Sequence, residues 1–116
     1  MPARPGCIIE EIVVEKLVAL SDRARNEPRD LYDLWHLLTS TALRIAELRA
    51  ELDAKLAFRQ RTAAGIEETI AAKEERLRRL WVARLAHQMN NLPEFDDVFR
   101  TVQRAVRAAD LPPAES

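Results

Sequence analysis

The sequence predicts an all-α protein, a bundle of four or five helices that includes one long antiparallel helical hairpin. Of its 116 residues, 47% are hydrophobic, 32% are charged and only two are glycine, which is typical of helices with charged outer faces. Strand-forming residues gather only at 8–14, and turn signals do not bound that segment on both sides. We therefore expect one helical domain over residues 8–109, an irregular lead-in at 1–7 and a disordered tail at 110–116.

The first helix is expected over residues 8–24, where apolar residues recur at intervals of four, four and three. Pro28 ends the preceding segment, because proline disfavours helical geometry in the residue before it, and it suits the first turn of a second helix. Asp30 falls in that turn, where the helix dipole favours a negative charge. The second helix keeps its apolar residues on one face up to a weak point at 39–41, where Ser40 is a candidate N-cap.

Two longer helices are expected to form the hairpin. A narrow apolar stripe over 45–56 predicts an amphipathic helix that faces a partner helix and ends near Arg61. Gly65 follows in the turn, since glycine readily adopts the left-handed conformation that terminates helices. The next helix is expected over 66–89 and a last one over 94–108. The stripe is narrow enough for a coiled-coil seam, and packing inside the chain is favoured over dimerisation.

Composition narrows the classes of function. A net charge of −1 argues against a general nucleic-acid binder, which normally carries a clear basic excess. The single cysteine, Cys7, cannot form an internal disulfide, and neither His36 nor His87 has neighbours with metal-ligand spacing, so we expect no metal site. No apolar run approaches the roughly 20 residues that span a bilayer. We expect a soluble, cytoplasmic protein that does not enter membranes.

The charged residues of the first two helices are the candidate site. Lys16 and Arg23 lie seven residues apart and should project from one side of the first helix, while Asp30 and Asp33 share a face of the second. A tight turn would bring these faces together. One interpretation is a salt-bridged clasp, in which Lys16 or Arg23 pairs with Asp33 and Arg29 holds a backbone carbonyl or the neighbouring glutamate.

The other interpretation is a phosphate-binding edge. A lysine beside a carboxylate can reach the triphosphate of a nucleotide, while the carboxylate orients the lysine or a metal-bound water. On this interpretation Lys16, Arg23 and Arg29 are the candidate nucleotide-binding residues. The candidate catalytic residues are Lys16, Asp30 and Asp33. Both interpretations remain open from the residues alone.

The order of these residues carries a family resemblance. Residues 11–20 read E-I-x-x-E-K-L-x-A-L, an arginine follows, and residues 29–34 read R-D-L-Y-D-L. This pattern resembles the C-terminal motif of AbiEii-type nucleotidyltransferase toxins, which belong to type IV toxin–antitoxin and phage-abortive systems. Many residues match the family pattern over 8–40, whereas the rest of the chain matches it only as a helix-rich sequence. It implies that Lys16 and Asp30, with Asp33 beside it, face the nucleotide pocket of a preceding catalytic half.

The catalytic motifs of that superfamily do not occur in this sequence. Its members carry a Gly-Ser pair and an Asp-x-Asp motif whose carboxylates position magnesium against the triphosphate. Neither glycine here precedes a serine, and no Asp-x-Asp occurs. The chain alone is therefore expected not to transfer nucleotides. By resemblance, magnesium and a nucleoside triphosphate would bind only with a separately encoded catalytic half, and tRNA is the acceptor in some members.

Two further expectations concern the origin and partners of the chain. It would be a truncated gene product, a cut fragment or one subunit of a split enzyme. The rival function is a non-enzymatic interaction module, in which the hairpin over 44–85 self-associates or wraps a partner protein such as an antitoxin. The first helix should also leave Ile8, Ile12, Val14 and Val18 uncovered, so we expect self-association or partner binding through residues 8–20.

Overall fold

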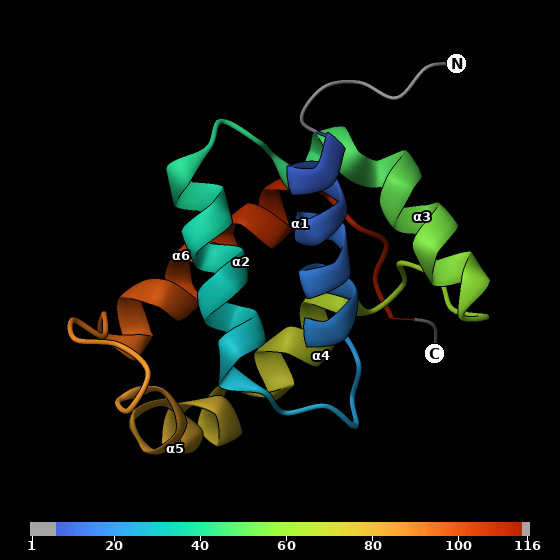
Figure 1. The fold of residues 1–116 in the computed structure, drawn as a ribbon. Helices are drawn as coiled ribbons and strands as arrows, with labels where there is room; N and C mark the ends of the chain where they lie inside the picture. Colours follow the sequence, from blue (N-terminus) through green and yellow to red (C-terminus); the bar gives the residue numbers. More distant parts are fainter. Residues whose placement is uncertain (1–6, 115–116) are drawn as a thin grey trace.

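A computed structural model describes residues 7–114 of the chain, and within them every regular element is helical. The elements are α1 (Cys7–Leu20), α2 (Pro28–Ser40), the 3-10 helix η1 (Ile45–Leu48), α3 (Arg49–Phe58), α4 (Ile66–Ala72), α5 (Glu74–Leu85) and α6 (Phe95–Ala108). The all-α bundle is confirmed (Figure 1). The expected lead-in over residues 1–6 lies outside the described residues.

The hairpin of this fold is formed by α1 and α2, which lie side by side and antiparallel (Figure 1). α1 ends at Leu20, four residues earlier than expected. The hydroxyl of Ser21 donates to the carbonyl of Val18 at 2.8 Å, and the carboxylate of Asp22 then accepts from the backbone N–H of Ala24 at 2.9 Å. These local side-chain bonds compete with the helical ladder, so the chain leaves the helix.

The second helix begins as expected and ends at the predicted weak point. Pro28 occupies its first turn, and the side chain of the N-cap residue Glu27 accepts from the backbone N–H of Arg29 at 3.2 Å. The expectation of an N-cap at Ser40 is wrong, because that residue closes α2. The hydroxyl of Thr41, which follows in extended conformation, donates back to a carbonyl of the helix it ends.

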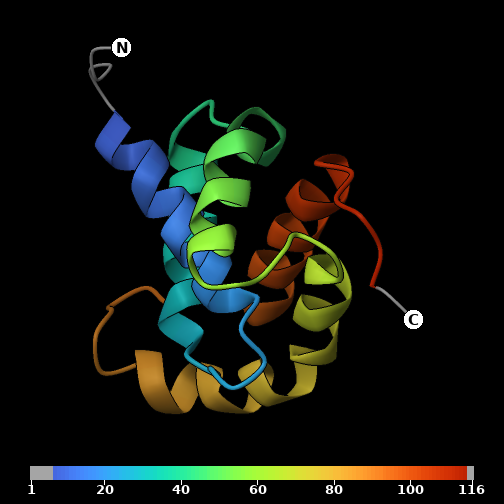
Figure 2. The ribbon, with the colours of Figure 1, turned by 90° about the vertical axis from the view of Figure 1, so that its right-hand side faces the viewer.

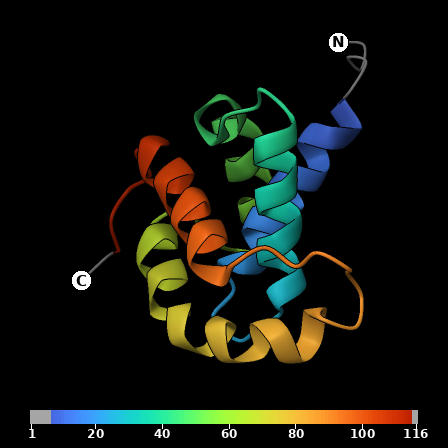
Figure 3. The same ribbon diagram turned by 90° about the vertical axis from the view of Figure 1, so that its left-hand side faces the viewer.

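The segment 66–89, expected as one helix, is two. α4 and α5 meet at a sharp angle at Lys73 (Figure 3), and α5 stops at Leu85. α3 packs mainly against α1 rather than against α4 or α5, so the predicted hairpin of the two middle segments is wrong. Gly65 has a positive φ of 80° as expected, but it precedes α4, and Gln60 (φ 59°) is the left-handed residue after α3.

The last helix folds back onto the others as predicted, and packs on α2, α4 and α5. Its two phenylalanines and three valines are all buried. Phe95 contacts Trp81 edge to face, with ring centroids 5.5 Å apart, and stacks on Phe99 at 5.4 Å. The indole N–H of Trp81 donates to the carbonyl of Pro93 at 2.9 Å, so this large side chain is buried without an unpaired donor.

The end of the described chain is irregular, as expected, but it is docked rather than frayed. Leu111 is buried, and the carbonyl of Pro112 accepts from the backbone N–H of Gly65 at 3.0 Å. The backbone N–H of Ala114 donates to the Glu68 carboxylate at 2.8 Å. Residues 115 and 116 lie outside the described residues. Across residues 7–114, no helix has the length and apolarity that a membrane span needs.

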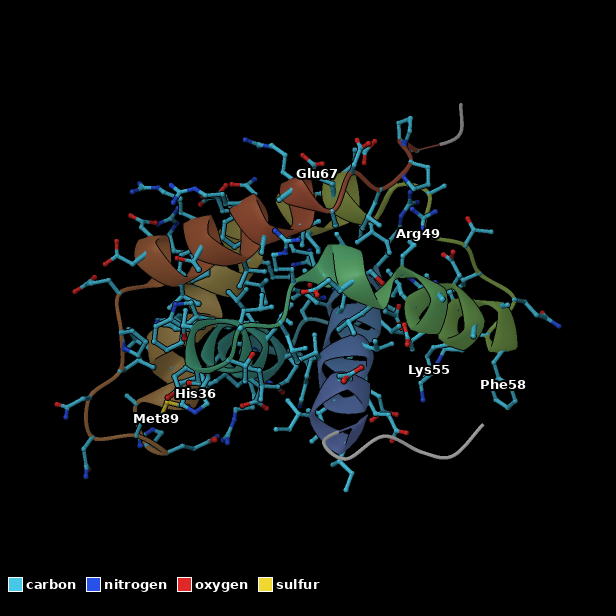
Figure 4. The ribbon with its side chains drawn as sticks, turned by 90° about the horizontal axis from the view of Figure 1, so that it is seen from above. His36, Arg49, Lys55, Phe58, Glu67 and Met89 are labelled. Atoms are coloured by element: carbon cyan, nitrogen blue, oxygen red, sulfur yellow. The ribbon has the colours of Figure 1, made fainter. Side chains whose placement is uncertain are left out.

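The outer face of α1 is covered over half of its length. Val14 and Val18 are buried, which contradicts their expected exposure, because α3 packs against this side of α1. Ile8 and Ile12 are exposed as expected, at 69% and 38% of their surface. Phe58 projects from the end of α3 and is 88% exposed (Figure 4). Apolar surface therefore remains at the start of α1 and at the end of α3.

We expect the isolated chain to self-associate through the exposed start of α1. Light scattering at micromolar concentration should give a mass above the 13.3 kDa of one chain. Ile12→Lys should shift the mass toward that of one chain, because it places a charge in the apolar surface. Val82→Lys, at a remote valine that is 65% exposed, is the matched control and should change nothing. A monodisperse 13.3 kDa species from the unmodified chain would contradict the expectation.

Candidate functional site

The aspartates of α2 face α1 and are joined by one lysine. The ammonium of Lys16 lies 2.9 Å from an oxygen of Asp33 and 3.4 Å from an oxygen of Asp30. The predicted pairing of Lys16 with Asp33 is therefore confirmed. Both aspartates lie one helical turn apart, so a single side chain from α1 reaches both.

Asp30 is the buried anchor of this cluster, with 2% of its side chain exposed. Arg25, in the loop between α1 and α2, donates from Nε to one carboxylate oxygen at 2.5 Å and from Nη2 to the other at 3.3 Å. Such charge-assisted, two-pronged pairing offsets the cost of burying the carboxylate. Sequence reasoning missed Arg25 because it expected a turn at this point without a side chain folding back on α2.

Asp33 is held from its second side by Arg29. Nε of Arg29 donates to Asp33 at 2.8 Å, and Nη1 donates to the side-chain oxygen of Gln88 at 2.6 Å. The expectation that the Arg29 side chain holds a backbone carbonyl or Glu27 is therefore wrong; only its backbone N–H reaches Glu27. The bond to Gln88 connects the cluster to the turn that follows α5.

The cluster holds three cations around two carboxylates, and its cationic side chains remain partly exposed: Lys16 at 27%, Arg25 at 51% and Arg29 at 46%. Burial alone lowers the pKa of Lys16, but the hydrogen bond and charge of Asp33, and then those of Asp30, outweigh it and raise the pKa above its ordinary value. Lys16 is thus an ammonium at neutral pH. The charged ends of Lys16, Arg25 and Arg29 stay partly open to solvent, and the carboxylates of Asp22 and Glu27 also lie near Arg25.

Arg23 is separate from this cluster. Because α1 ends at Leu20, Arg23 lies in the loop and not beside Lys16 on a helix face, as the sequence had led us to expect. It forms no ion pair with any residue between 7 and 114, and it lines a groove beside α4 and α5 together with Arg76 and Arg79.

The loop that carries Arg25 is held by two side chains that sequence reasoning did not single out. The ammonium of Lys73 donates to the backbone carbonyls of Leu20 and Arg25, at 2.6 Å each. Nη2 of Arg61 donates to the carbonyl and the hydroxyl of Ser21, at 2.9 Å each. Burial lowers the pKa of Lys73 to about 8, although Asp22 and Asp30 partly offset it.

The carboxylate pair does not fit a divalent metal. All four oxygens of Asp30 and Asp33 contact Lys16, Arg25 or Arg29, so none is free to serve as a ligand. In the part of the chain that the structure describes, no other group of three histidine, cysteine, aspartate or glutamate side chains has metal-binding geometry.

Comparison with known proteins identifies a family. The family model described as "Nucleotidyl transferase AbiEii toxin, Type IV TA system" matches residues 9–101, which is most of the chain and includes the whole charged cluster. A search of proteins with curated functions and a search of solved structures gave no match.

Proposed function

Because the chain belongs to the AbiEii family of nucleotidyl transferase toxins from type IV toxin–antitoxin systems, we propose that its Lys16 cluster contacts the phosphates of a nucleotide. The cluster would form one edge of a nucleotide site whose other side is a catalytic half not contained in these 116 residues. The substrate would be a nucleoside triphosphate. Membership of a type IV system implies an antitoxin as partner.

The preorganised and partly exposed cations of the cluster are the observation that supports this proposal. Asp30 and Asp33 hold Lys16, Arg25 and Arg29 in defined positions while leaving their charged ends partly exposed. Phosphate oxygens accept strong hydrogen bonds from such groups, and a preorganised cluster loses little conformational entropy when it binds them. In this role Lys16, Arg25 and Arg29 would touch the ligand. Asp30 and Asp33 would position them.

Catalysis itself would come from elsewhere. The sequence contains no Gly-Ser pair and no Asp-x-Asp motif, and both aspartates of the cluster are already paired with cations. Magnesium would therefore be held by the catalytic half. We propose that these 116 residues alone transfer no nucleotide, and that their complement is a catalytic half that carries both motifs.

The test is reconstitution with that complement. The chain alone should show no magnesium-dependent transfer from any radiolabelled nucleoside triphosphate, whereas the mixture should. Lys16→Ala should lower transfer by the mixture at least about tenfold, the effect of one lost charge-assisted phosphate contact. Its effect on the stability of the chain should stay below about 1 kcal/mol, because Asp30 keeps Arg25 and Asp33 keeps Arg29.

Lys55→Ala is the matched control, since Lys55 is a similarly exposed lysine that pairs with Glu15 outside the cluster. It should leave transfer unchanged. Robust transfer by the chain alone would refute the claim that the site is shared. Equal transfer by the Lys16 and Lys55 variants would refute the phosphate contact.

A second candidate function is a non-enzymatic interaction module. The hairpin once expected to carry it does not form, but Ile8 and Ile12 on α1 and Phe58 on α3 supply exposed apolar surface. In that case the Lys16 cluster would only clasp the hairpin of α1 and α2. Lys16→Ala would then alter stability and partner binding together, with no effect of nucleotide on either.

A further inference from the structure

A second cationic site lies outside the Lys16 cluster, in a groove of about 370 Å³ between the loop at 21–27 and the helices α4 and α5. Figure 2 shows that loop, in blue, running beside α4 and α5. None of Lys16, Asp30 and Asp33 lines the groove. Its walls carry four cationic and two acidic side chains: Arg23, Lys73, Arg76, Arg79, Glu68 and Glu75.

The three arginines of the groove are exposed, and no residue in the described range pairs with them. Both acidic residues already have partners, and the partner of Glu68, Ala114, also lines the groove. Glu68 accepts from the backbone N–H of Ala114 at 2.8 Å, and Glu75 lies 3.6 Å from Nε of Arg78. Three like charges that converge on one groove repel one another, and a bound anion would remove that repulsion.

The groove is also held in shape before any ligand arrives. Lys73 is buried, lines the groove, and donates to the carbonyls of Leu20 and Arg25, which precede and follow Arg23 in the sequence. Arg76 and Arg79 lie three residues apart and so share one face of α5. The arginines from the loop and from the helix are therefore presented to the same space by a fixed backbone.

We propose that this groove binds phosphate groups through Arg23, Arg76 and Arg79. Asn26 and Thr69, which also line it, provide neutral donors for a phosphate oxygen. The phosphates belong either to a free nucleotide or to the backbone of a polynucleotide, which present the same oxygens to guanidinium groups. The site is independent of the nucleotide edge proposed above, because the two share no side chain.

The test is a titration of the full chain with two probes, sodium pyrophosphate and a fluorescent 12-nucleotide single-stranded RNA. The variant Arg23→Gln/Arg76→Gln/Arg79→Gln should bind the better probe at least about tenfold more weakly. The matched control is Arg59→Gln/Arg100→Gln/Arg104→Gln, which removes the same charge from three exposed arginines outside the groove. At a fixed salt concentration, the affinity of this control variant for each probe should lie within about twofold of the affinity of the unmodified chain.

The two probes also separate the two sources of phosphate. Tighter binding of RNA, with a steep dependence on salt, identifies a polynucleotide backbone; tighter binding of pyrophosphate identifies a free nucleotide. Equal losses for the groove and control variants, or no binding of either probe, would overturn the proposal. Loss of binding is measured on the triple arginine variant in these titrations, whereas the nucleotide edge is tested by Lys16→Ala in the reconstituted transfer assay, so failure of the nucleotide edge and failure of the groove are distinguishable.

Discussion

Asp30→Ala should lower the free energy of unfolding by about 2–4 kcal/mol, because it removes the buried carboxylate on which the hairpin of α1 and α2 converges. Asp30 is 2% exposed and pairs with Lys16 from α1 and with Arg25 from the loop. Both cations lose a partner in the variant, and Lys16 remains partly buried beside Asp33. Chemical denaturation followed by circular dichroism at neutral pH measures the change.

Asp53→Ala is the control for this prediction. Asp53 also pairs with an arginine, Arg49 at 3.0 Å, but both side chains are about half exposed, so the loss should stay below about 0.5 kcal/mol. Asp30→Asn keeps the shape of the side chain, so its loss of unfolding free energy should lie between the losses for Asp30→Ala and Asp53→Ala. A loss below about 1 kcal/mol for Asp30→Ala would mean that Asp30 does not anchor the hairpin.

Lys73→Met should be comparably destabilising. The methionine fills much of the same space but leaves the carbonyls of Leu20 and Arg25 without their 2.6 Å donors. We expect a loss of about 1–3 kcal/mol at pH 7. Lys55→Met, at a surface lysine, should cost far less.

The loss caused by Lys73→Met should grow with pH. Lys73 has a pKa of about 8 in the folded protein and an ordinary value of 10.5 in the unfolded chain. Between these values the unfolded chain holds more protons, so the stability of the unmodified protein rises with pH by up to about 3 kcal/mol. The methionine variant lacks this gain. The pKa of Lys16 is raised in the folded protein, so its contribution to stability is lost only above pH 10.5. That loss is the same in the unmodified protein and in the variant.

Denaturation curves of the unmodified protein and of Lys73→Met, measured at several pH values between 7 and 10.5, check this dependence. The range spans the pKa of Lys73 in the folded and in the unfolded chain. The difference in unfolding free energy should widen steadily across the range. If the difference in unfolding free energy stays constant, Lys73 keeps its proton in the folded protein. If the difference narrows as the pH rises, the pKa of Lys73 is raised in the folded protein instead of lowered.

Local patterns predicted the helices that end at recognisable signals. The helix predicted over 94–108 differs from α6 by one residue at its start. Its apolar positions share a face, and Pro93 interrupts the preceding segment. The break at Lys73 had no such signal. Alanine, lysine and glutamate around it all favour helix, and the chain bends there where Lys73 bonds to carbonyls 53 and 48 residues away.

Local residue spacing predicted one part of the candidate site, and the path of the loop, which spacing does not determine, decided the rest. The spacing of Asp30 and Asp33, and the turn before them, sufficed to bring Lys16 to both. The roles of Arg25 and Arg23 depend on the path of the loop, which begins after Leu20 and folds Arg25 back onto α2. No periodicity encodes that path, because side-chain bonds to the loop backbone determine it.

The bonds from Lys73 and Arg61 to this loop have a consequence for how the protein folds. The hairpin of α1 and α2 is local in sequence, yet the carbonyls of Leu20, Ser21 and Arg25 find these donors only 40–53 residues later. The hairpin is therefore incomplete until the middle of the chain has docked. Opening of the segment that carries Arg61 and Lys73 would expose those carbonyls in turn, so we expect both regions to open together and their amide hydrogens to exchange with a common free energy.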